Sequence, residues 1–478
     1  MTLDQLVTIL PLVILAASAV VVTLVIAFHR NHVLTFILTL IALLLAFLAL
    51  FVTPSTSPQV TALLSMDNYA RFFIGLVVAA CFVVAILSYG YLQGRSINPE
   101  ELYLLLLLAT LGASVLAAST HFASFFLGLE ILSVSLYSLI AYLRETERGI
   151  EGGLKYLILA GSSSSFLLFG MALVYAEAGT MQFTQITSLR PAGSNVQSVI
   201  MLTGLALIVV GIGFKLAVVP FHLWTPDVYE GAPAPVTSFI ATVSKGAMFA
   251  LLLRYFTQID LHAYGSLFIV FALIALASMV VGNLLGLLQR NVKRLLAYSS
   301  IAHLGYLLVA FMASGPLAVT AVAFYLVAYF VTTLGAFGVI TVLSSKEGEL
   351  QDIDDYRGLA RSHPWVAGAF TAMLLSLAGI PLTVGFVGKF YLVAAGVNSA
   401  LFLLVIVLVL TSAIGLFYYL RVIIAMFSLP EPGLERPARS LPAAGSAMLA
   451  VLTVLLIGLG VYPAPLIQII QALVGRII

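Results

Sequence analysis

Long apolar runs separated by short polar connections make up most of the chain. A helix needs about 20 apolar residues to cross a hydrocarbon layer about 30 Å thick. Fourteen runs approach or exceed this length: 3–28, 33–52, 70–92, 102–119, 122–143, 154–176, 198–224, 235–256, 264–288, 294–313, 317–343, 365–395, 400–427 and 441–472. The pattern predicts an all-α polytopic membrane protein with about fourteen transmembrane helices.

Two of these predicted helices are interrupted in a related way. The seventh carries Lys215 before Pro220, and the twelfth carries Pro381 before Lys389. Proline cannot donate to the helix ladder, and membranes allow such a break only where protein or water satisfies the freed backbone groups. The two helices are five apart, and a shift of five helices reverses orientation across the membrane. We therefore predict two inverted five-helix repeats with discontinuous helices 7 and 12, because paired broken helices indicate an ion site.

This periodicity divides the chain into four predicted parts. Residues 1–100 hold helices 1 to 3, and residues 101–260 form the first repeat, helices 4 to 8. Residues 261–428 form the second, inverted repeat, helices 9 to 13. Residues 429–478 hold the last helix.

The amino-acid composition is typical of a membrane protein and of no other class. The chain is 62% hydrophobic and 8% charged, whereas soluble proteins average about 25% charged residues, and the mean hydropathy is +1.15. The formal net charge is +2, and no basic patch predicts a nucleic-acid partner, so the expected environment is the lipid bilayer. Cys81 is the single cysteine, which excludes an intrachain disulfide and a cysteine metal site.

Basic residues favour one side of the predicted membrane. Of the 21 lysines and arginines, fourteen lie after odd-numbered helices or at their ends, three lie inside helices, and the other four are Arg71, Arg190, Arg254 and Arg476. Cytoplasmic loops are enriched in such residues, so both termini are predicted on the non-cytoplasmic side. The N-terminus lacks a basic leader and a small-residue cleavage site, which predicts a retained first helix.

Four ionisable residues fall inside predicted helices: Glu130, Lys215, Lys245 and Lys389. A lysine at the bilayer centre costs roughly 2.5–3.5 kcal/mol, so each must face the protein interior or water. Burial disfavours the charged form of lysine, which lets it exchange a proton, whereas an arginine would stay charged. The choice of lysine favours a proton relay. The alternative is a fixed Glu–Lys pair that joins two helices, which would use only one of the three lysines.

Further polar residues are open to two interpretations. His303 on helix 10 could bridge the two broken helices or be a hydrogen-bonded interior residue. His222, just after the first break, could line a proton path or cap freed carbonyls. Lys155 at the start of helix 6 is expected to reach the cytoplasmic interface, with a role in the relay as the alternative. Asp227 and Glu230 are expected in a solvated turn at the cytoplasmic mouth.

No motif for a redox cofactor was found in the sequence. There is no Gly-rich dinucleotide fingerprint after a strand, no phosphate-binding loop, no CxxC and no histidine pair spaced for haem or iron. The tyrosines and phenylalanines are dispersed and are expected in the core and at the membrane interface, not in a quinone site.

Residues 213–245, GFKLAVVPFHLWTPDVYEGAPAPVTSFIATVSK, closely resemble the signature of the antiporter-like membrane subunits of respiratory complex I. NVKRLLAYSSIAHLGYL and LSLAGIPLTVGFVGKFYLV match further segments of that family. The resemblance runs from the HRNH loop to VYPAPL. Three details favour one branch of the family: Lys245 where other branches usually carry histidine, Lys389 where one carries glutamate, and no long lateral helix after helix 14.

The resemblance implies roles for individual residues. Glu130 resembles the helix 5 glutamate that pairs with the helix 7 lysine, Lys215. Lys245 resembles the connecting residue of helix 8, His303 the helix 10 histidine, and Lys389 the terminal lysine of the second half-channel. Lys155 corresponds to a further family position on helix 6.

The resemblance also implies partners and an activity. The expected function is proton translocation coupled to electron transfer from NADH to quinone, in a bacterial cell inner membrane. FMN, iron–sulfur clusters and quinone would be held by other subunits, and the neighbours would be the antiporter-like subunit M and small membrane subunits. Three alternatives remain: a subunit of a multisubunit cation/proton antiporter, a non-pumping scaffold, and direct quinone chemistry, which has little support in the sequence.

Overall fold

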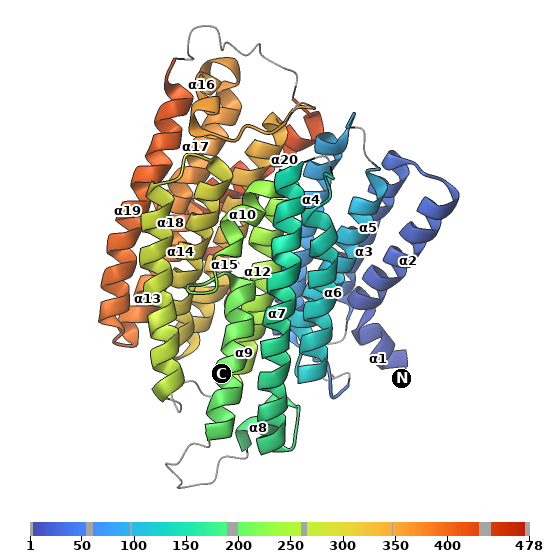
Figure 1. The fold of residues 1–478 in the computed structure, drawn as a ribbon, viewed down its shortest axis with the longest axis vertical. Coiled ribbons are helices and arrows are strands. Elements are labelled where there is room, and N and C mark those ends of the chain that lie inside the picture. The colour runs from blue at the N-terminus through green and yellow to red at the C-terminus, as the bar shows by residue number, and fades with distance from the viewer. Residues whose placement is uncertain are drawn as a thin grey trace.

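The computed structural model describes residues 3–53, 61–95, 98–144, 146–188, 199–259, 265–346, 348–429 and 441–473. These residues form a bundle of helices (Figure 1), which confirms the predicted all-α membrane fold. Thirteen helices in the described part are long and apolar enough to cross a membrane. Four basic residues used to assign the sides, Arg190, Arg436, Arg439 and Arg476, lie outside the described residues.

The helices up to the middle of the chain are α1 (Leu3–Thr8), α2 (Leu10–Phe28), α3 (His32–Val52), α4 (Asn68–Leu92), α5 (Glu100–Ala118), α6 (Phe122–Ile140), α7 (Glu147–Ala178), α8 (Phe183–Ser188), α9 (Val199–Leu216), α10 (Trp224–Gly231), α11 (Ala234–Phe239), the π-helical turn η1 (Ile240–Ser244) and α12 (Lys245–Ile259).

The remaining helices are α13 (Gly265–Leu287), α14 (Val292–Met312), α15 (Pro316–Leu343), the 3-10 turn η3 (Ile353–Tyr356), α16 (Leu359–Ser362), α17 (Pro364–Ala378), α18 (Val384–Asn398), α19 (Phe402–Phe427), α20 (Ala443–Val461) and α21 (Ala464–Leu473).

Both predicted helix breaks are confirmed. Pro220 lies between α9 and α10, and Pro381 lies between α17 and α18. Each break holds one non-glycine residue in the left-handed region, Ala217 with φ 60° and Leu382 with φ 70°. This conformation is uncommon for residues with a side chain and persists where the surroundings hold it. A helix therefore ends shortly before each proline, and a new helix begins after it.

The predicted twelfth helix accounts for the difference between fourteen apolar runs and thirteen long helices. Its two halves, α17 and α18, have 15 residues each, or about 22 Å at 1.5 Å per residue, too short to span alone. The prediction of one helix over 441–472 is wrong in one respect, because α20 and α21 are separate. They part at Tyr462 and Pro463, since a proline disfavours helix at the residue before it.

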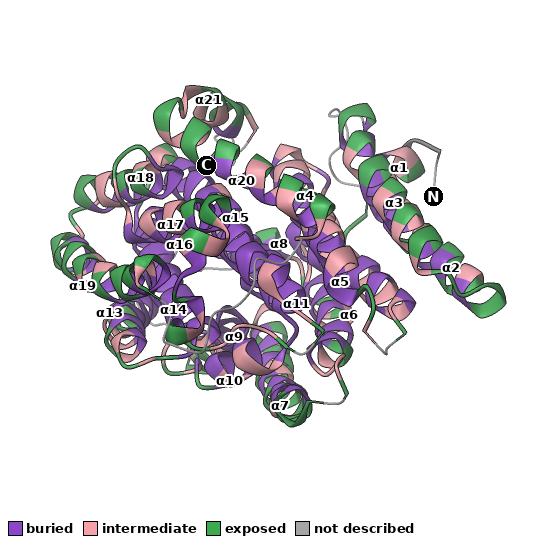
Figure 2. Ribbon diagram, turned by 90° about the horizontal axis from the view of Figure 1, so that it is seen from above, coloured by how far each residue is buried: buried purple, intermediate pink, exposed green. Residues whose placement is uncertain are grey.

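The most buried helices lie at the centre of the bundle. The span made by α11, η1 and α12 is completely buried in its most apolar window, and α14 and α15 are nearly so. Viewed from above, exposed residues colour the outer faces of α2, α7, α13 and α19 while the centre is buried (Figure 2). Many exposed side chains are large and apolar, as expected for a surface that faces lipid.

The two predicted repeats pack their helices in the same pattern. In residues 101–260, α5 packs on α6 and α12, α6 on α7, and α7 on α9. In residues 261–428, α13 packs on α14 and α19, α14 on α15, and α15 on α18. This agreement is what two copies of one unit would give, and the division into inverted repeats stays a prediction.

Close packing inside the first of these units gives a test. A Cβ added at Gly112 of α5 would lie 2.5 Å from the Leu132 amide nitrogen and 2.8 Å from the Gly128 carbonyl oxygen of α6. Because backbone atoms cannot move aside, we expect Gly112→Val to lower the free energy of unfolding by about 1–3 kcal/mol. The measurement is the melting temperature and yield of the detergent-purified protein. Gly161→Val is the control, since nothing lies within 4 Å of that site, and equal stability of both variants would contradict the packing.

Candidate functional site

The predicted site residues come from helices on both sides of the buried centre. Lys215 ends α9, Lys245 begins α12 and Lys389 lies in α18. Their exposed fractions are 3%, 1% and 9%. Each lysine is therefore almost completely enclosed by protein, as an ammonium group at membrane depth requires.

Lys215 is held by two neutral hydroxyl groups. Its Nζ donates to Ser133 Oγ at 2.9 Å and to Tyr156 OH at 2.8 Å, both buried. The lysine lies just before the break, where Trp224 Nε1 donates to the Phe214 carbonyl at 3.1 Å. The same carbonyl accepts the Ala217 amide at 2.9 Å, so the indole adds a second hydrogen bond at the end of α9.

Glu130 does not form a direct ion pair with Lys215 within the described residues. Its Oε1 accepts a hydrogen bond from Ser164 Oγ of α7 at 2.6 Å, and the residue is half-buried. Ser133, which contacts Lys215, lies three residues further along α6, on the same face. The expected pairing is therefore one helical turn from direct contact, and its role stays a prediction.

His222 lies in the first break and is 6% exposed. Neither ring nitrogen has a hydrogen-bond partner within the described part of the chain. The ring lies close enough to the Pro220 backbone to interact with it, so a proton path and the capping of freed carbonyls both stay open.

Lys245 follows the π-helical turn η1 in the middle of the bundle. Such turns are rare and often occur at functional sites. Its Nζ donates to Ser300 Oγ of α14 at 2.6 Å and lies 5.3 Å from the ring centre of Tyr229. Tyr329 OH also donates to Ser300 at 2.7 Å, so this serine joins α12, α14 and α15.

His303 lies one turn further along α14, between two tyrosines. Its Nδ1 shares a hydrogen bond with Tyr325 OH at 2.7 Å, and its Nε2 is 3.4 Å from Tyr419 OH. Tyr419 OH is also hydrogen-bonded to Ser299 Oγ. The histidine therefore connects α14 with α15 and α19, and its role as a bridge between the two broken helices stays a prediction.

Lys389 reaches across the second break to the end of α17. Its Nζ donates to the carbonyls of Leu377 at 2.7 Å and Ala378 at 2.9 Å, and to Ser412 Oγ at 2.6 Å. The last carbonyls of a helix lack intrahelical partners and carry partial negative charge. The ammonium group is thus stabilised by the broken helix itself.

Buried tyrosines form a part of the site that the sequence analysis missed. Tyr306, whose ring centre is 5.3 Å from Lys389 Nζ, accepts a hydrogen bond from Asn283 at 2.8 Å. Asn283 accepts one from Tyr418 at 3.1 Å, and Tyr418 is 3.5 Å from Tyr419. These tyrosines lie in the core, as expected, but their hydroxyls connect His303 with the surroundings of Lys389. The available signal was the placing of Ser299, Ser300, His303 and Tyr306 within two turns of α14.

Lys155 and the acids of α10 form an ionic cluster. Lys155 Nζ contacts Asp227 and Glu151, each at 2.6 Å. Arg294 contacts Asp227 at 2.7 Å and Glu230 at 2.9 Å. The expectation that Asp227 and Glu230 lie in a merely solvated turn is wrong, because both are paired. Lys155 is 42% exposed in its side chain, consistent with a position at the interface.

The structure suggests no metal centre in its described part, where no group of three or more His, Cys, Asp or Glu side chains converges. Cys81 is buried and free.

Broken helices with enclosed lysines in a multi-pass bundle define an antiporter-like membrane protein. Residues 119–415 match the model of the NADH:quinone oxidoreductase/Mrp antiporter transmembrane family, and the chain belongs to this family.

Similar curated proteins refine the placement. NADH-quinone oxidoreductase subunit N of Nitrosospira multiformis is 58% identical, over 98% of this chain and 96% of that protein. The subunit N proteins of Ectopseudomonas mendocina and Methylococcus capsulatus are each 49% identical over 98% of this chain, covering 97% and 95% of those proteins.

Solved structures share the fold. A chain of respiratory complex I from Thermus thermophilus with bound aureothin is 34% identical with a TM-score of 0.82, covering 96% of this chain and 98% of that one. A chain of the Mrp complex from a Dietzia species has a TM-score of 0.86 at 21% identity, covering 100% of this chain and 99% of that one. At that identity the Mrp likeness shows the fold alone.

Proposed function

We propose that this chain is the proton-translocating membrane subunit N of an NADH–quinone oxidoreductase. Support comes from its similarity along nearly the full length to subunit N proteins and to a complex I chain. The redox cofactors belong to other subunits of the complex. The energy comes from electron transfer there, because each charge moved works against about 2.3 kcal/mol per 100 mV.

The main structural support for a proton relay is that the groups around the three lysines are neutral. Within the described residues, Lys215, Lys245 and Lys389 make no ion pair, although other buried basic residues do. Hydroxyls and carbonyls stabilise an ammonium group less firmly than a carboxylate does. Each lysine can therefore lose its proton without leaving a buried carboxylate unpaired. In a fixed structural ion pair, loss of the lysine proton would leave such a carboxylate.

The polar contacts suggest an order for the relay. Glu130 and Lys215 lie at one side, Lys245 at the centre, and His303 between the centre and Lys389. A change in the charge of the Glu130–Lys215 region would alter proton affinity at Lys245 and then at Lys389. Hydroxyls of Ser300, the core tyrosines and ordered water would carry protons between them.

The partners in this proposal are the antiporter-like subunit M and small membrane subunits. The face of α6 around Glu130 supports a partner there, since Leu127 is 58% and Val134 57% exposed. A half-buried carboxylate beside such apolar residues is unfavourable in lipid, and a neighbouring subunit would cover it.

The first test replaces Lys215 by alanine. We expect the complex to assemble and oxidise NADH with an artificial acceptor. Quinone reduction and proton pumping in membrane vesicles should fall by about a hundredfold, the lower end of the range for loss of a proton-transfer group. Lys346→Ala, at an exposed position, is the control and should pump normally. Normal pumping by Lys215→Ala would leave this lysine a packing residue and refute the relay.

A second test removes the hydroxyl that holds Lys245. Ser300→Ala takes away the acceptor of both Lys245 and Tyr329, so pumping should fall severalfold, with little change in assembly. Ser162→Ala is matched in chemistry, because that exposed hydroxyl bonds only the carbonyl of Ile158 in its own helix. Equal pumping by the two variants would remove Ser300 from the path.

We also propose that the chain lies in a bacterial inner membrane with its basic loops in the cytoplasm. A Cys81→Ser background allows single-cysteine labelling. A cysteine at Asp354, 62% exposed in its side chain, should react with a membrane-impermeant maleimide only in inverted vesicles. A cysteine at exposed Gln185 should react only in intact, right-side-out spheroplasts. The reverse result would invert the orientation.

A further inference from the structure

A buried ion pair joins the connection between α15 and η3 to the centre of the bundle. Lys293 Nζ is 2.6 Å from Glu349 Oε2, and their side chains are 2% and 10% exposed. Lys293 lies at the start of α14 and Glu349 in the connection after α15, and both are nevertheless buried. They are distant in sequence, so no local pattern predicts their contact.

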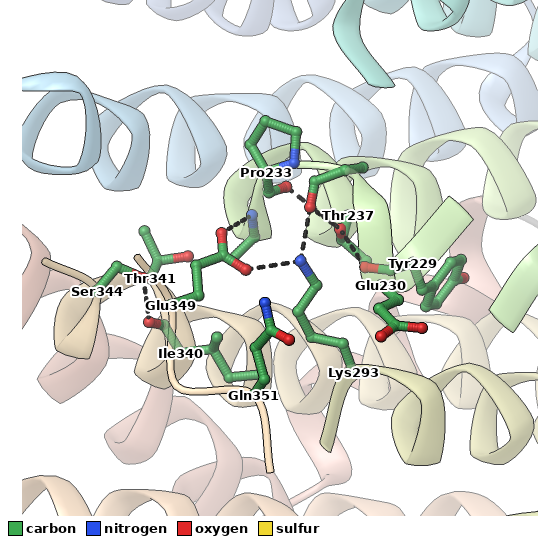
Figure 3. A network of polar contacts seen from close by, with 12 residues as sticks. Tyr229, Glu230, Pro233, Thr237, Lys293, Ile340, Thr341, Ser344, Glu349 and Gln351 are labelled. Atoms are coloured by element: carbon green, nitrogen blue, oxygen red, sulfur yellow. Dashed lines mark hydrogen bonds and ion pairs between the residues drawn. The ribbon is translucent and has the colours of Figure 1, made fainter. Parts of the chain in front are cut away.

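Further contacts enclose both charges (Figure 3). Glu349 Oε1 accepts hydrogen bonds from Tyr91 OH at 2.6 Å and from the Ala234 amide at 2.8 Å. Lys293 Nζ also donates to the Ala232 carbonyl at 2.6 Å. Burial raises the pKa of Glu349, but the Lys293 ammonium and these hydrogen bonds outweigh it, and the pKa lies below its usual value. Glu349 is therefore a carboxylate at neutral pH.

Backbone hydrogen bonds also hold the connection in place. The Val292 amide donates to the Gln351 carbonyl at 2.7 Å, and the Ile353 amide donates to the Arg290 carbonyl at 2.9 Å. These backbone bonds form an antiparallel bridge between Asn291 and Asp352. A buried ion pair often stabilises a fold no better than apolar residues of the same size, so its presence here calls for another reason.

Polar groups continue from the pair toward Lys245. Lys293 and Ser300 are seven residues apart on one face of α14, about 10.5 Å along the helix. Ser300 Oγ is the acceptor of Lys245 at 2.6 Å and is 3.4 Å from Tyr229 OH.

A second set of groups runs beside α14. The Ala232 carbonyl that binds Lys293 also accepts from Thr237 Oγ1 at 3.3 Å, and Thr237 Oγ1 is likewise 3.3 Å from the Tyr229 carbonyl. Figure 3 shows Thr237 and Tyr229 on the side of Lys293 that leads away from Glu349.

We propose that Glu349 and Lys293 form the proton-uptake station that supplies Lys245 from the side of the basic loops. This inference rests on the proposed function, because it assumes that Lys245 receives a proton in each cycle. It adds two residues to those that the sequence analysis selected.

The proton count of the step balances. Lys293 passes a proton inward by way of Tyr229, Ser300 and ordered water to the neutral amine of Lys245, and becomes an amine. Glu349, now an unpaired buried carboxylate, takes a proton from the aqueous side. That proton moves to the Lys293 amine and restores the ion pair. One proton has then entered from water and one has reached Lys245.

Other charged groups near the pair are fixed by their own contacts. Arg95 lies 4.2 Å from the Tyr91 ring centre and donates to the Ser345 carbonyl at 2.7 Å. Glu230 of α10 is paired with Arg148 and Arg294. The sequences of α11 and α15 hold no Asp, Glu, Lys, Arg or His, so Glu349 is the carboxylate that faces Lys293.

The test is Glu349→Gln, which keeps an oxygen for Tyr91 and the Ala234 amide but removes the charge. In inverted vesicles at neutral pH we expect quinone-coupled pumping to fall about tenfold, with normal assembly and artificial-acceptor activity. The loss should grow at alkaline pH, because reprotonation of Lys293 would then depend on free hydronium. Formate, a small acid able to carry protons, should restore part of the rate, and Glu349→Asp should retain most of it.

Gln351→Ala is the control, because it removes only a side-chain contact of the connection with Arg148 at 2.9 Å and should pump normally. Normal pumping by Glu349→Gln across the pH range would overturn the inference. Loss of assembly by Glu349→Gln would also overturn it, and so would a loss of pumping that neither formate nor pH changes. Either result would show that the ion pair only stabilises the structure. Lys245→Ala, measured in parallel, separates the failures: if it pumps normally, the proposed relay itself fails.

Discussion

An ammonium group inside a bilayer must have its water shell replaced by the protein. For Lys215, Lys245 and Lys389 this replacement is made by hydroxyls and carbonyls. Such groups lower the cost of the charge without fixing it, since they also tolerate a neutral amine as a hydrogen-bond partner. A carboxylate would hold the proton more firmly and would be left unpaired when the proton departs. The choice of neutral partners therefore sets how readily each lysine can change its charge, and the central helices are arranged to supply them.

The broken helices follow from the same requirement. In a continuous helix the Ala378 carbonyl would bond the amide of Leu382, whereas the Leu377 carbonyl would face Pro381, which has no N–H. Because α17 ends at Ala378, both carbonyls are free for Lys389. At the first break the Phe214 carbonyl accepts from the Trp224 indole and the Ala217 amide. Lys215 donates instead to Ser133 and Tyr156. Each break contains a proline and a left-handed residue, but the two lysines bind different kinds of acceptor.

Features carried by local pattern could be predicted from the sequence, and features made by distant contacts could not. The lengths of the apolar runs predicted the membrane spans, and Pro220 and Pro381 predicted the helix breaks. Lysines within apolar runs predicted the candidate relay. The split between α20 and α21 was missed although Pro463 signalled it, because the run was judged by hydropathy alone. The pairing of Lys293 with Glu349 depends on how the connection after α15 folds back, which no window of sequence shows. The core tyrosines look like packing residues until their hydroxyls are seen to meet.

Apart from Lys293 and Glu349, the distribution of paired and unpaired charges separates fixed from movable charge. Lys155, Arg294, Asp227 and Glu230 form one paired cluster at the end with the basic loops. Near the opposite end, Arg254 is bound by both oxygens of Asp67 at 2.7 Å. Between these ends the lysines have no counter-ion within the described residues, and the medium is less polarisable than water. A proton gained or lost at one lysine is therefore felt by the next more strongly than it would be in water, because Coulomb interactions weaken as the local dielectric constant rises. Because the charges at both ends of the bundle are paired and the three central lysines are not, a change of charge at one lysine can act on its neighbour.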